Sequence, residues 1–214
     1  MHKTAQELRN AKRGPLVVKA LKRRFFDAWY VDTRDEAVEQ ILSLIPKTGT
    51  VSWGGSLTIS TLGIPERLLH EGITVLDRDQ AATAEERQEI MRRALCCDTF
   101  LSSSNALSED GHLVNIDGIG NRVAAMIYGP RQVIVAAGMN KVVKTLEDAI
   151  VRARTIAAPL NMQRFSHLKT PCGETGTCAD CGSADSICSY LVITRLCKPA
   201  GRIKVILIGE DLGF

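Results

Sequence analysis

Residues 99–138 read TFLSSSNALSEDGHLVNIDGIGNRVAAMIYGPRQVIVAAG and contain the clearest strand pattern in the chain. Three apolar runs of strand length lie in this stretch, at Thr99–Ser102, Leu113–Ile116 and Val133–Ala137. Short apolar runs bounded by glycine and polar residues are typical of buried strands. Between the first two runs, Glu109, Asp110 and Gly111 have the composition of a hairpin turn. The stretch therefore predicts closely spaced strands at the centre of the fold.

The alternation of strands and helices continues outward in both directions. Further strands are predicted at Ala28–Val31, Thr50–Trp53, Ile73–Leu76 and Ile203–Ile208. Apolar residues at helical spacing predict helices over Thr4–Phe26, from an N-cap at Asp35 to Pro46, and over Leu57–Glu71, Thr83–Leu95 and Lys141–Ala157. Such alternation predicts an α/β fold, with a mainly parallel sheet covered by helices on both faces.

The length and composition predict one α/β domain with a cysteine-rich excursion. The chain has 214 residues, of which 45% are hydrophobic and 24% charged, as in ordinary soluble domains. Residues 1–158 and 202–214 are assigned to the α/β domain. Residues 159–201 are polar, rich in cysteine and poor in core residues, and are assigned to a metal-binding insertion within that domain.

Charge and hydropathy bear on partners and location. A net charge of +3 is too small to argue for nucleic acid, so the basic segment Thr4–Phe26 is interpreted as the solvated face of a helix. No apolar stretch is long enough to span a bilayer. The first residues contain no apolar core of signal-peptide length, and we therefore expect a cytoplasmic protein.

Four of the seven cysteines predict a metal centre. Cys172, Cys178, Cys181 and Cys188 fall within seventeen residues, with the spacing C-x5-C-x2-C-x6-C. A loop with so few apolar residues cannot offset its ordering entropy, whereas thiolate–metal bonds can. Zinc sites usually use two separated C-x2-C pairs, so a single compact loop favours an iron–sulfur (4Fe-4S) cluster, with zinc as the alternative. The remaining possibility is a flexible loop with unrelated thiols.

Polar residues and glycines at the predicted strand ends suggest a ligand crevice. In a parallel sheet the carboxyl ends of the strands meet at one edge, where ligands bind. An arginine beside glycines suits an anionic small molecule, and Asp117 is the candidate catalytic base. The alternative is that these residues only satisfy loop backbone groups. The predicted ligand-binding residues are Gly54, Gly55, Ser56, Asn105, Asn115, Asp117, Asn121, Arg122, Asn140 and Lys141.

The chain resembles the lactate-utilisation (LUD) domain family. The resemblance is carried by VSWGGS, SSNALSEDGHLVNIDGIGNRVAAMIYGP, VIVAAGMNKVV, IAAPLN, PCGETGTCADC and GRIKVILIGEDLGF, which together cover nearly the whole chain. It implies a Rossmann-like fold similar to ribose-5-phosphate isomerase and CoA-transferase domains. It also implies a site for a phosphate-bearing or CoA-like ligand at the strand ends. This chain differs from the small subunit of lactate-oxidation operons in carrying its own cysteine loop.

Two functions follow as expectations. The first is a redox-linked accessory component of lactate or hydroxy-acid utilisation, with a four-cysteine metal centre and with other subunits of a redox complex as partners. The second is an enzyme acting on a phosphorylated or CoA-like small molecule, with a purely structural metal. A nucleic-acid-binding regulator that uses the basic N-terminal helix is a third, less favoured alternative.

Overall fold

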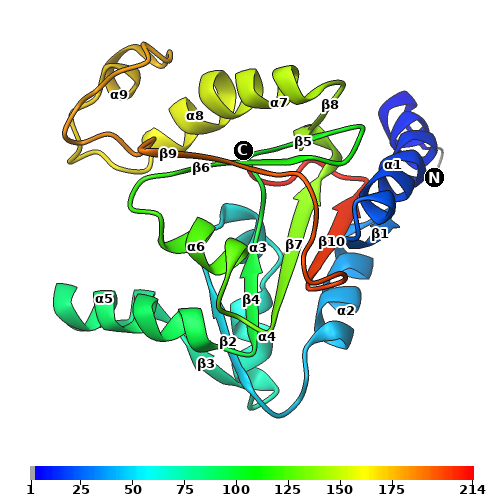
Figure 1. Cartoon of the computed structure of the whole chain (residues 1–214), viewed down its shortest axis with the longest axis horizontal. Helices are drawn as coiled ribbons and strands as arrows, with labels where there is room; N and C mark the ends of the chain where they lie inside the picture. The colour runs from blue at the N-terminus through cyan, green and yellow to red at the C-terminus, as the bar shows by residue number, and fades with distance from the viewer. Residues whose placement is uncertain (1–2) are drawn as a thin grey trace.

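A computed structural model describes residues 3–214 and shows two sheets with helices packed around them (Figure 1). The larger sheet has six parallel strands in the order β1-β10-β7-β4-β2-β3. Its strands are β1 (Asp27–Val31), β10 (Ile203–Ile208), β7 (Gln132–Gly138), β4 (Thr99–Ser102), β2 (Thr50–Trp53) and β3 (Thr74–Leu76). The predicted α/β class and parallel sheet are confirmed.

The smaller sheet is built from the hairpin and from segments far along the chain. Its order is β8-β5-β6-β9, with β5 and β6 antiparallel, β6 and β9 antiparallel, and β5 and β8 parallel. The strands are β8 (Val142–Val143), β5 (Ala106–Ser108), β6 (Leu113–Asp117) and β9 (Tyr190–Thr194). The predicted turn joins β5 to β6, where Gly111 has a positive φ of 93° and donates its N–H to the Ser108 carbonyl.

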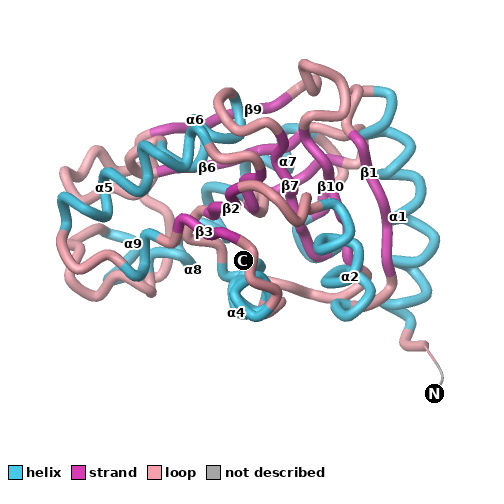
Figure 2. Tube along the Cα trace, turned by 90° about the horizontal axis from the view of Figure 1, so that it is seen from below, coloured by secondary structure: helices cyan, strands magenta, loops and turns pink. Residues whose placement is uncertain are grey.

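The helices cover both faces of the larger sheet, and Figure 2 shows α1 running alongside β1 at one edge. They are α1 (Ala5–Arg23), α2 (Arg34–Leu44), α3 (Leu57–Thr61), α4 (Ile64–His70), α5 (Ala84–Arg93), α6 (Asn121–Ile127), α7 (Leu146–Arg152), α8 (Ala158–Met162) and α9 (Pro171–Thr175). Single 3₁₀ turns occur at Arg78–Gln80, Ala94–Cys96 and Met139–Lys141, and a π-helical turn at Ala153–Ala157 joins α7 to α8.

Alternate residues of the central strands face two separate cores. Val133 and Val135 of β7 point to the face covered by α1, α6 and the β5–β6 hairpin. Ile134 and Ala136 point to the face covered by α2, α3 and α4. Because both faces are buried, the strands read as mainly apolar runs, which is why their positions could be predicted from the sequence.

Two predicted helix boundaries are wrong. The cap of α2 is Thr33, whose hydroxyl accepts from the Glu36 N–H, and Asp35 lies inside the first turn. The helix predicted to begin at Lys141 begins instead at Leu146, because Thr145 caps it. The residues before it form a 3₁₀ turn and β8, which pairs with β5.

The cysteine-rich segment is not wholly an excursion. Its first residues continue the helical run through α8, and its second half contributes β9, which pairs with β6 along five residue pairs. The part between them, around α9, projects away from the sheets at the upper left of Figure 1. Segment 159–201 is therefore anchored to the domain at both of its ends.

Two arginines, one within α1 and one at its C-cap, contact the smaller sheet and the segments beside it. Arg13 contacts the Glu109 carboxylate and the Val142 carbonyl. Arg24 contacts the Asp110 carboxylate and the Arg195 carbonyl. Part of the basic face therefore forms hydrogen bonds and ion pairs with the smaller sheet and its turn, and does not face solvent alone. In the described residues no helix combines the length and apolar character needed to cross a membrane.

Candidate functional site

A crevice of about 400 Å³ opens where the carboxyl ends of β2, β4 and β7 face the end of β6. Each of these strands ends in a polar or glycine-rich segment that lines the crevice: Gly55 follows β2, Ser103 follows β4, and Lys141 follows β7. Parallel strands deliver their carboxyl ends to one edge, so segments far apart in sequence meet there.

Seven of the ten residues predicted to bind a ligand line this crevice: Gly55, Ser56, Asn105, Asp117, Asn121, Arg122 and Lys141. The other three, Gly54, Asn115 and Asn140, do not line the crevice. A Cβ on Gly54 would lie 3.0 Å from the Arg122 side chain, and Asn115 is fully buried against the same arginine. Asn140 Nδ2 donates to the Gly213 carbonyl, so it orders the C-terminal tail. That these residues bind a ligand stays a prediction.

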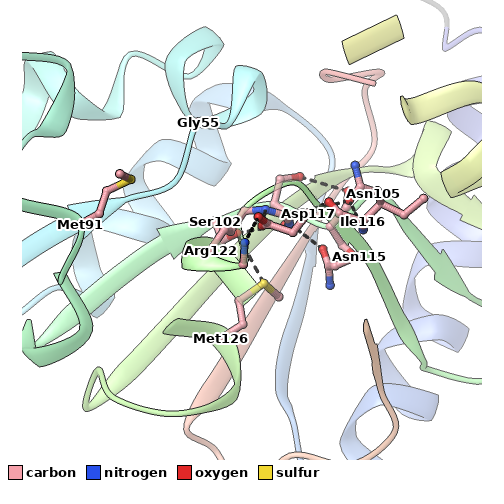
Figure 3. Close-up of polar contacts among 12 residues, drawn as sticks. Gly55, Met91, Ser102, Asn105, Asn115, Ile116, Asp117, Arg122 and Met126 are labelled. Atoms are coloured by element: carbon pink, nitrogen blue, oxygen red, sulfur yellow. Dashed lines mark hydrogen bonds and ion pairs between the residues drawn. The ribbon is translucent and has the colours of Figure 1, made fainter. Parts of the chain in front are cut away.

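Arg122 is committed to the protein rather than to the crevice. It lies in the first turn of α6, and Figure 3 shows its guanidinium surrounded by acceptors. Nε faces Asp117 Oδ2 at 3.2 Å, Nη1 donates to the Ser103 carbonyl and to Asn115 Oδ1, and Nη2 donates to Asn105 Oδ1 and to the Ile116 carbonyl. With every nitrogen engaged, the geometry does not support the predicted role of Arg122 in anion binding.

Asp117 is engaged in the same way. Its Oδ2 pairs with Arg122, and its Oδ1 accepts the N–H of Gly120, which caps α6. Both carboxylate oxygens therefore stabilise the turn between β6 and α6. The geometry supports the alternative raised from the sequence, in which Asp117 satisfies loop groups, over its role as a base.

Lys141 is the buried amine of the crevice. Lys141 as a whole is only 3% exposed, and its Nζ donates hydrogen bonds to Thr58 Oγ1 and Ser103 Oγ, each at 3.0 Å. Burial, followed by the positive charges of Arg152 and Arg122, lowers the pKa of Lys141 to about 7. Among the described residues no carboxylate lies within ion-pair distance of Nζ.

Arg78 is a crevice residue that sequence reasoning missed. Its Nε is buried without a hydrogen-bond partner, and the nearest carboxylate, of Asp79, is 3.9 Å from it. Burial lowers the pKa of this guanidinium. Arg78 lies two residues after the end of β3, so the strand-end rule applied to the predicted strand Ile73–Leu76 could have found it. Its Nη1 donates to the Met91 sulfur at 3.4 Å, and within the described residues the guanidinium donates to no protein oxygen.

The cysteine loop borders the crevice. Ile187, next to Cys188, lines the crevice, and its backbone lies 3.4 Å from the position of a Cβ on Gly118. Arg164, which precedes the loop, donates to the Gly55 carbonyl. The loop and the strand ends thus form one continuous wall.

The Cys188 thiol is influenced by the other three thiols of the loop. Burial, followed by the neighbouring thiols of Cys172, Cys178 and Cys181, raises the pKa of Cys188 to about 11. Within residues 3–214, however, no three His, Cys, Asp or Glu side chains are arranged closely enough to hold a metal ion. The four-cysteine metal centre stays a prediction.

Comparison with known proteins identifies the family. The family model described as "LUD domain" matches residues 15–208 of this chain. A DUF162 family protein from Deinococcus radiodurans has a similar fold, with a TM-score of 0.54 and 15% identity over 93% of this chain and 98% of that one. Ribose 5-phosphate isomerase A from Neisseria gonorrhoeae matches 53% of this chain and 54% of its own, with a TM-score of 0.35 and 14% identity. The isomerase from Methanocaldococcus jannaschii matches 63% of this chain and 56% of its own, with a TM-score of 0.33 and 18% identity. No curated protein matches.

Proposed function

The chain belongs to the LUD domain family of lactate-utilisation-related proteins, and we propose that it is a redox-linked accessory component that binds a small 2-hydroxy or 2-oxo carboxylate. The carboxylate occupies the crevice beside a four-cysteine metal centre. The observation that carries this proposal is the pair of basic side chains, Arg78 and Lys141, which line one crevice; within the described residues Arg78 donates no hydrogen bond to a protein oxygen, and Lys141 Nζ has no carboxylate within ion-pair distance.

The electrostatics of the crevice favour an anion. The Arg78 guanidinium is planar and lines the crevice, and its one hydrogen bond among the described residues is from Nη1 to the Met91 sulfur, so a carboxylate would be a better partner for it. Since a buried positive charge without a counterion is costly, a bound carboxylate would relieve that cost. Of the aspartates that line the crevice, Asp117 is paired with Arg122 and Asp79 with Arg87.

The cysteine loop fits the chemistry of an iron–sulfur cluster. Its four sulfur donors are Cys172, Cys178, Cys181 and Cys188, and the loop between them has no lysine, arginine or histidine to compete as a ligand or partner. Arg154 contacts Asp180 and Cys178, so positive charge stands beside the sulfurs of a group that carries net negative charge. When bound, a 4Fe-4S cluster would supply one-electron transfer next to the crevice, whereas zinc would be purely structural.

Ligand binding is tested by calorimetry with L-lactate and pyruvate. Arg78→Gln should weaken binding by about 1.5–3 kcal/mol, the scale of a hydrogen bond to a charged group. Arg92→Gln is the matched control, because Arg92 lies exposed on α5. Equal affinities for the wild type and Arg78→Gln, or no binding of either acid, would contradict the proposal.

The metal centre is tested on protein purified without oxygen. A broad visible absorption band with bound iron and sulfide is expected, and Cys178→Ser or Cys181→Ser should remove it. Cys96→Ser serves as the control, since Cys96 is an exposed thiol outside the loop. Colourless protein with one equivalent of zinc would assign the site a structural role, and full metal content in the double variant would refute the ligand set.

A second candidate is an enzyme acting on a phosphorylated or CoA-like molecule. The crevice volume of about 400 Å³ exceeds what a three-carbon acid fills, and the exposed Arg164 adds positive charge at its rim. Inorganic phosphate and coenzyme A are therefore included as competitors in the binding assay. Displacement of a bound acid by either compound at lower concentration than lactate would favour this second function.

A further inference from the structure

We propose that Lys141 is a nucleophile that forms an imine with the carbonyl carbon of a 2-oxo acid held in the crevice. This inference rests on the proposed function, because the acid must first bind there. It goes further in naming the substrate class, a 2-oxo rather than a 2-hydroxy acid, and in giving Lys141 a covalent role. The argument depends on how the Lys141 nitrogen is held.

The two hydrogen-bond partners of Lys141 both act as acceptors. Thr58 Oγ1 donates its own hydrogen to the Leu212 carbonyl, at 3.4 Å, and Ser103 Oγ donates to the Ser104 carbonyl, at 3.5 Å. Each hydroxyl therefore presents a lone pair to Nζ, which donates to both. The surroundings satisfy two N–H groups of the amine.

The third position on the nitrogen is unclaimed by the described residues. In the neutral amine this position holds the lone pair, and Lys141 lines the crevice. Two acceptors are as many as a neutral amine can use, so its lone pair is left at the third position. The fixed nitrogen is thus prepared to attack an electrophile in the crevice.

The charges around Lys141 also favour the neutral amine. The groups that act on it are the guanidiniums of Arg152, which donates to the Asn105 and Asn140 carbonyls, and of Arg122. The nearby carboxylate of Asp117 is paired with Arg122. Together with burial these charges place the pKa of Lys141 at about 7. At neutral pH its free-amine fraction is then roughly a thousandfold larger than that of an exposed lysine.

The short segment after β2, residues 55–58, contacts both basic side chains. Gly55 lies against Arg78, whose Nη2 would be 2.5 Å from a Cβ at that position, and Thr58 accepts from Lys141. Both side chains line the same crevice, so an acid bound there lies in the space onto which Lys141 opens. A 2-oxo acid has the required chemistry, because its carbonyl carbon is bonded directly to the carboxylate.

The covalent step balances without an oxidant or reductant. The nitrogen lone pair forms a C–N bond to the carbonyl carbon, and the π electrons of the C=O bond move to oxygen. When the remaining C–O bond breaks, that oxygen leaves as water with the two protons of the amine. A neutral C=N bond remains, and the oxidation state of the acid is unchanged.

The experiment is reductive trapping with pyruvate. Full-length protein is incubated with pyruvate and sodium cyanoborohydride, and its intact mass is measured. We expect one reduced pyruvate adduct per chain, saturable in pyruvate, and peptide mapping should place it on Lys141. L-Lactate, which has no carbonyl group, should compete for the crevice but form no adduct. As the pH is raised toward about 7, the trapping rate should increase roughly tenfold per pH unit, because the free-amine fraction increases by that factor, and above about pH 7 it should level off.

Two variants complete the test. Lys141→Arg retains positive charge but should abolish the adduct, whereas Lys144→Arg, at an exposed lysine that pairs with Glu109, should leave it unchanged. The mapping on wild-type protein decides the question even if Lys141→Arg does not fold. Pyruvate binding by calorimetry with no adduct, or an adduct on another lysine, would overturn the inference and leave the proposed function intact. Failure of both pyruvate and lactate to bind would overturn both.

Discussion

Replacing Arg122 tests whether this residue supports the fold or the ligand. Arg122→Met removes a guanidinium that makes four hydrogen bonds and one ion pair within the protein, while keeping an apolar chain of similar length. The side chains of Arg122 and Asp117 are only 14% and 9% exposed, so Asp117 would be left as a buried charge without its partner. Breaking a buried pair in this way costs about 3–5 kcal/mol of unfolding free energy.

The assay is urea denaturation followed by both far-UV circular dichroism and tryptophan fluorescence. Arg122→Met should lower the unfolding free energy by that amount, and Arg122→Met combined with Asp117→Asn should recover about 1–3 kcal/mol of the loss. Arg92→Met, on the exposed face of α5, should change stability by less than about 0.5 kcal/mol. A loss below about 1 kcal/mol for Arg122→Met, accompanied by weaker anion binding, would refute this reasoning and restore the ligand-binding role.

Three further predictions use thermal or urea unfolding. The pKa of Lys141 falls from 10.5 to about 7 on folding, so between these values the unfolded chain binds the extra proton and stability rises with pH. Lys141→Met should remove this rise, which is up to about 1.4 kcal/mol per pH unit, and an unchanged pH profile would contradict it. Gly129→Ala should destabilise by about 2–4 kcal/mol, because φ is +116° and the added Cβ would lie 2.3 Å from the Leu95 carbonyl oxygen; a neutral effect would show that the loop relaxes. Burial opposes ionisation of Asp110, but hydrogen bonds, first from Ser108, hold its pKa at about 2. Its stabilising contribution is therefore complete above about pH 4 and lost as the pH falls toward 2, and Asp110→Asn should lack this acid-dependent loss.

The strands could be predicted because burial on both faces determines the composition of each strand's own residues. Thr50–Trp53, Thr99–Ser102 and Ile203–Ile208 have the predicted bounds, since a strand covered on both faces is mainly apolar, and its run of apolar residues stands out from the polar loops around it. Helix starts were less certain, because several residues near each start could act as caps. Thr33 and Asp35 are both good N-caps, and only the course of the chain out of β1 selected Thr33.

The meeting of distant segments in a crevice also followed from the sequence. Once the sheet is parallel, the residues after β2, β4 and β7 must gather at one edge, and Gly55 and Lys141 do so. The cysteine spacing likewise predicts a metal centre that remains to be tested. These inferences depend only on strand direction and on residue type.

The roles of the crevice residues were decided by the tertiary structure alone. Sequence reasoning chose Arg122 for the anion, yet Asn105, Asn115 and Asp117 occupy its guanidinium, while Arg78, which lines the same crevice, donates among the described residues only to the Met91 sulfur. The side chains are of the same type, and nothing in their local sequence distinguishes them. An arginine is available to a ligand only if the folded protein leaves its donors unsatisfied in a place that water or substrate can reach. That condition depends on every neighbour in space, and most of those neighbours are remote in the chain.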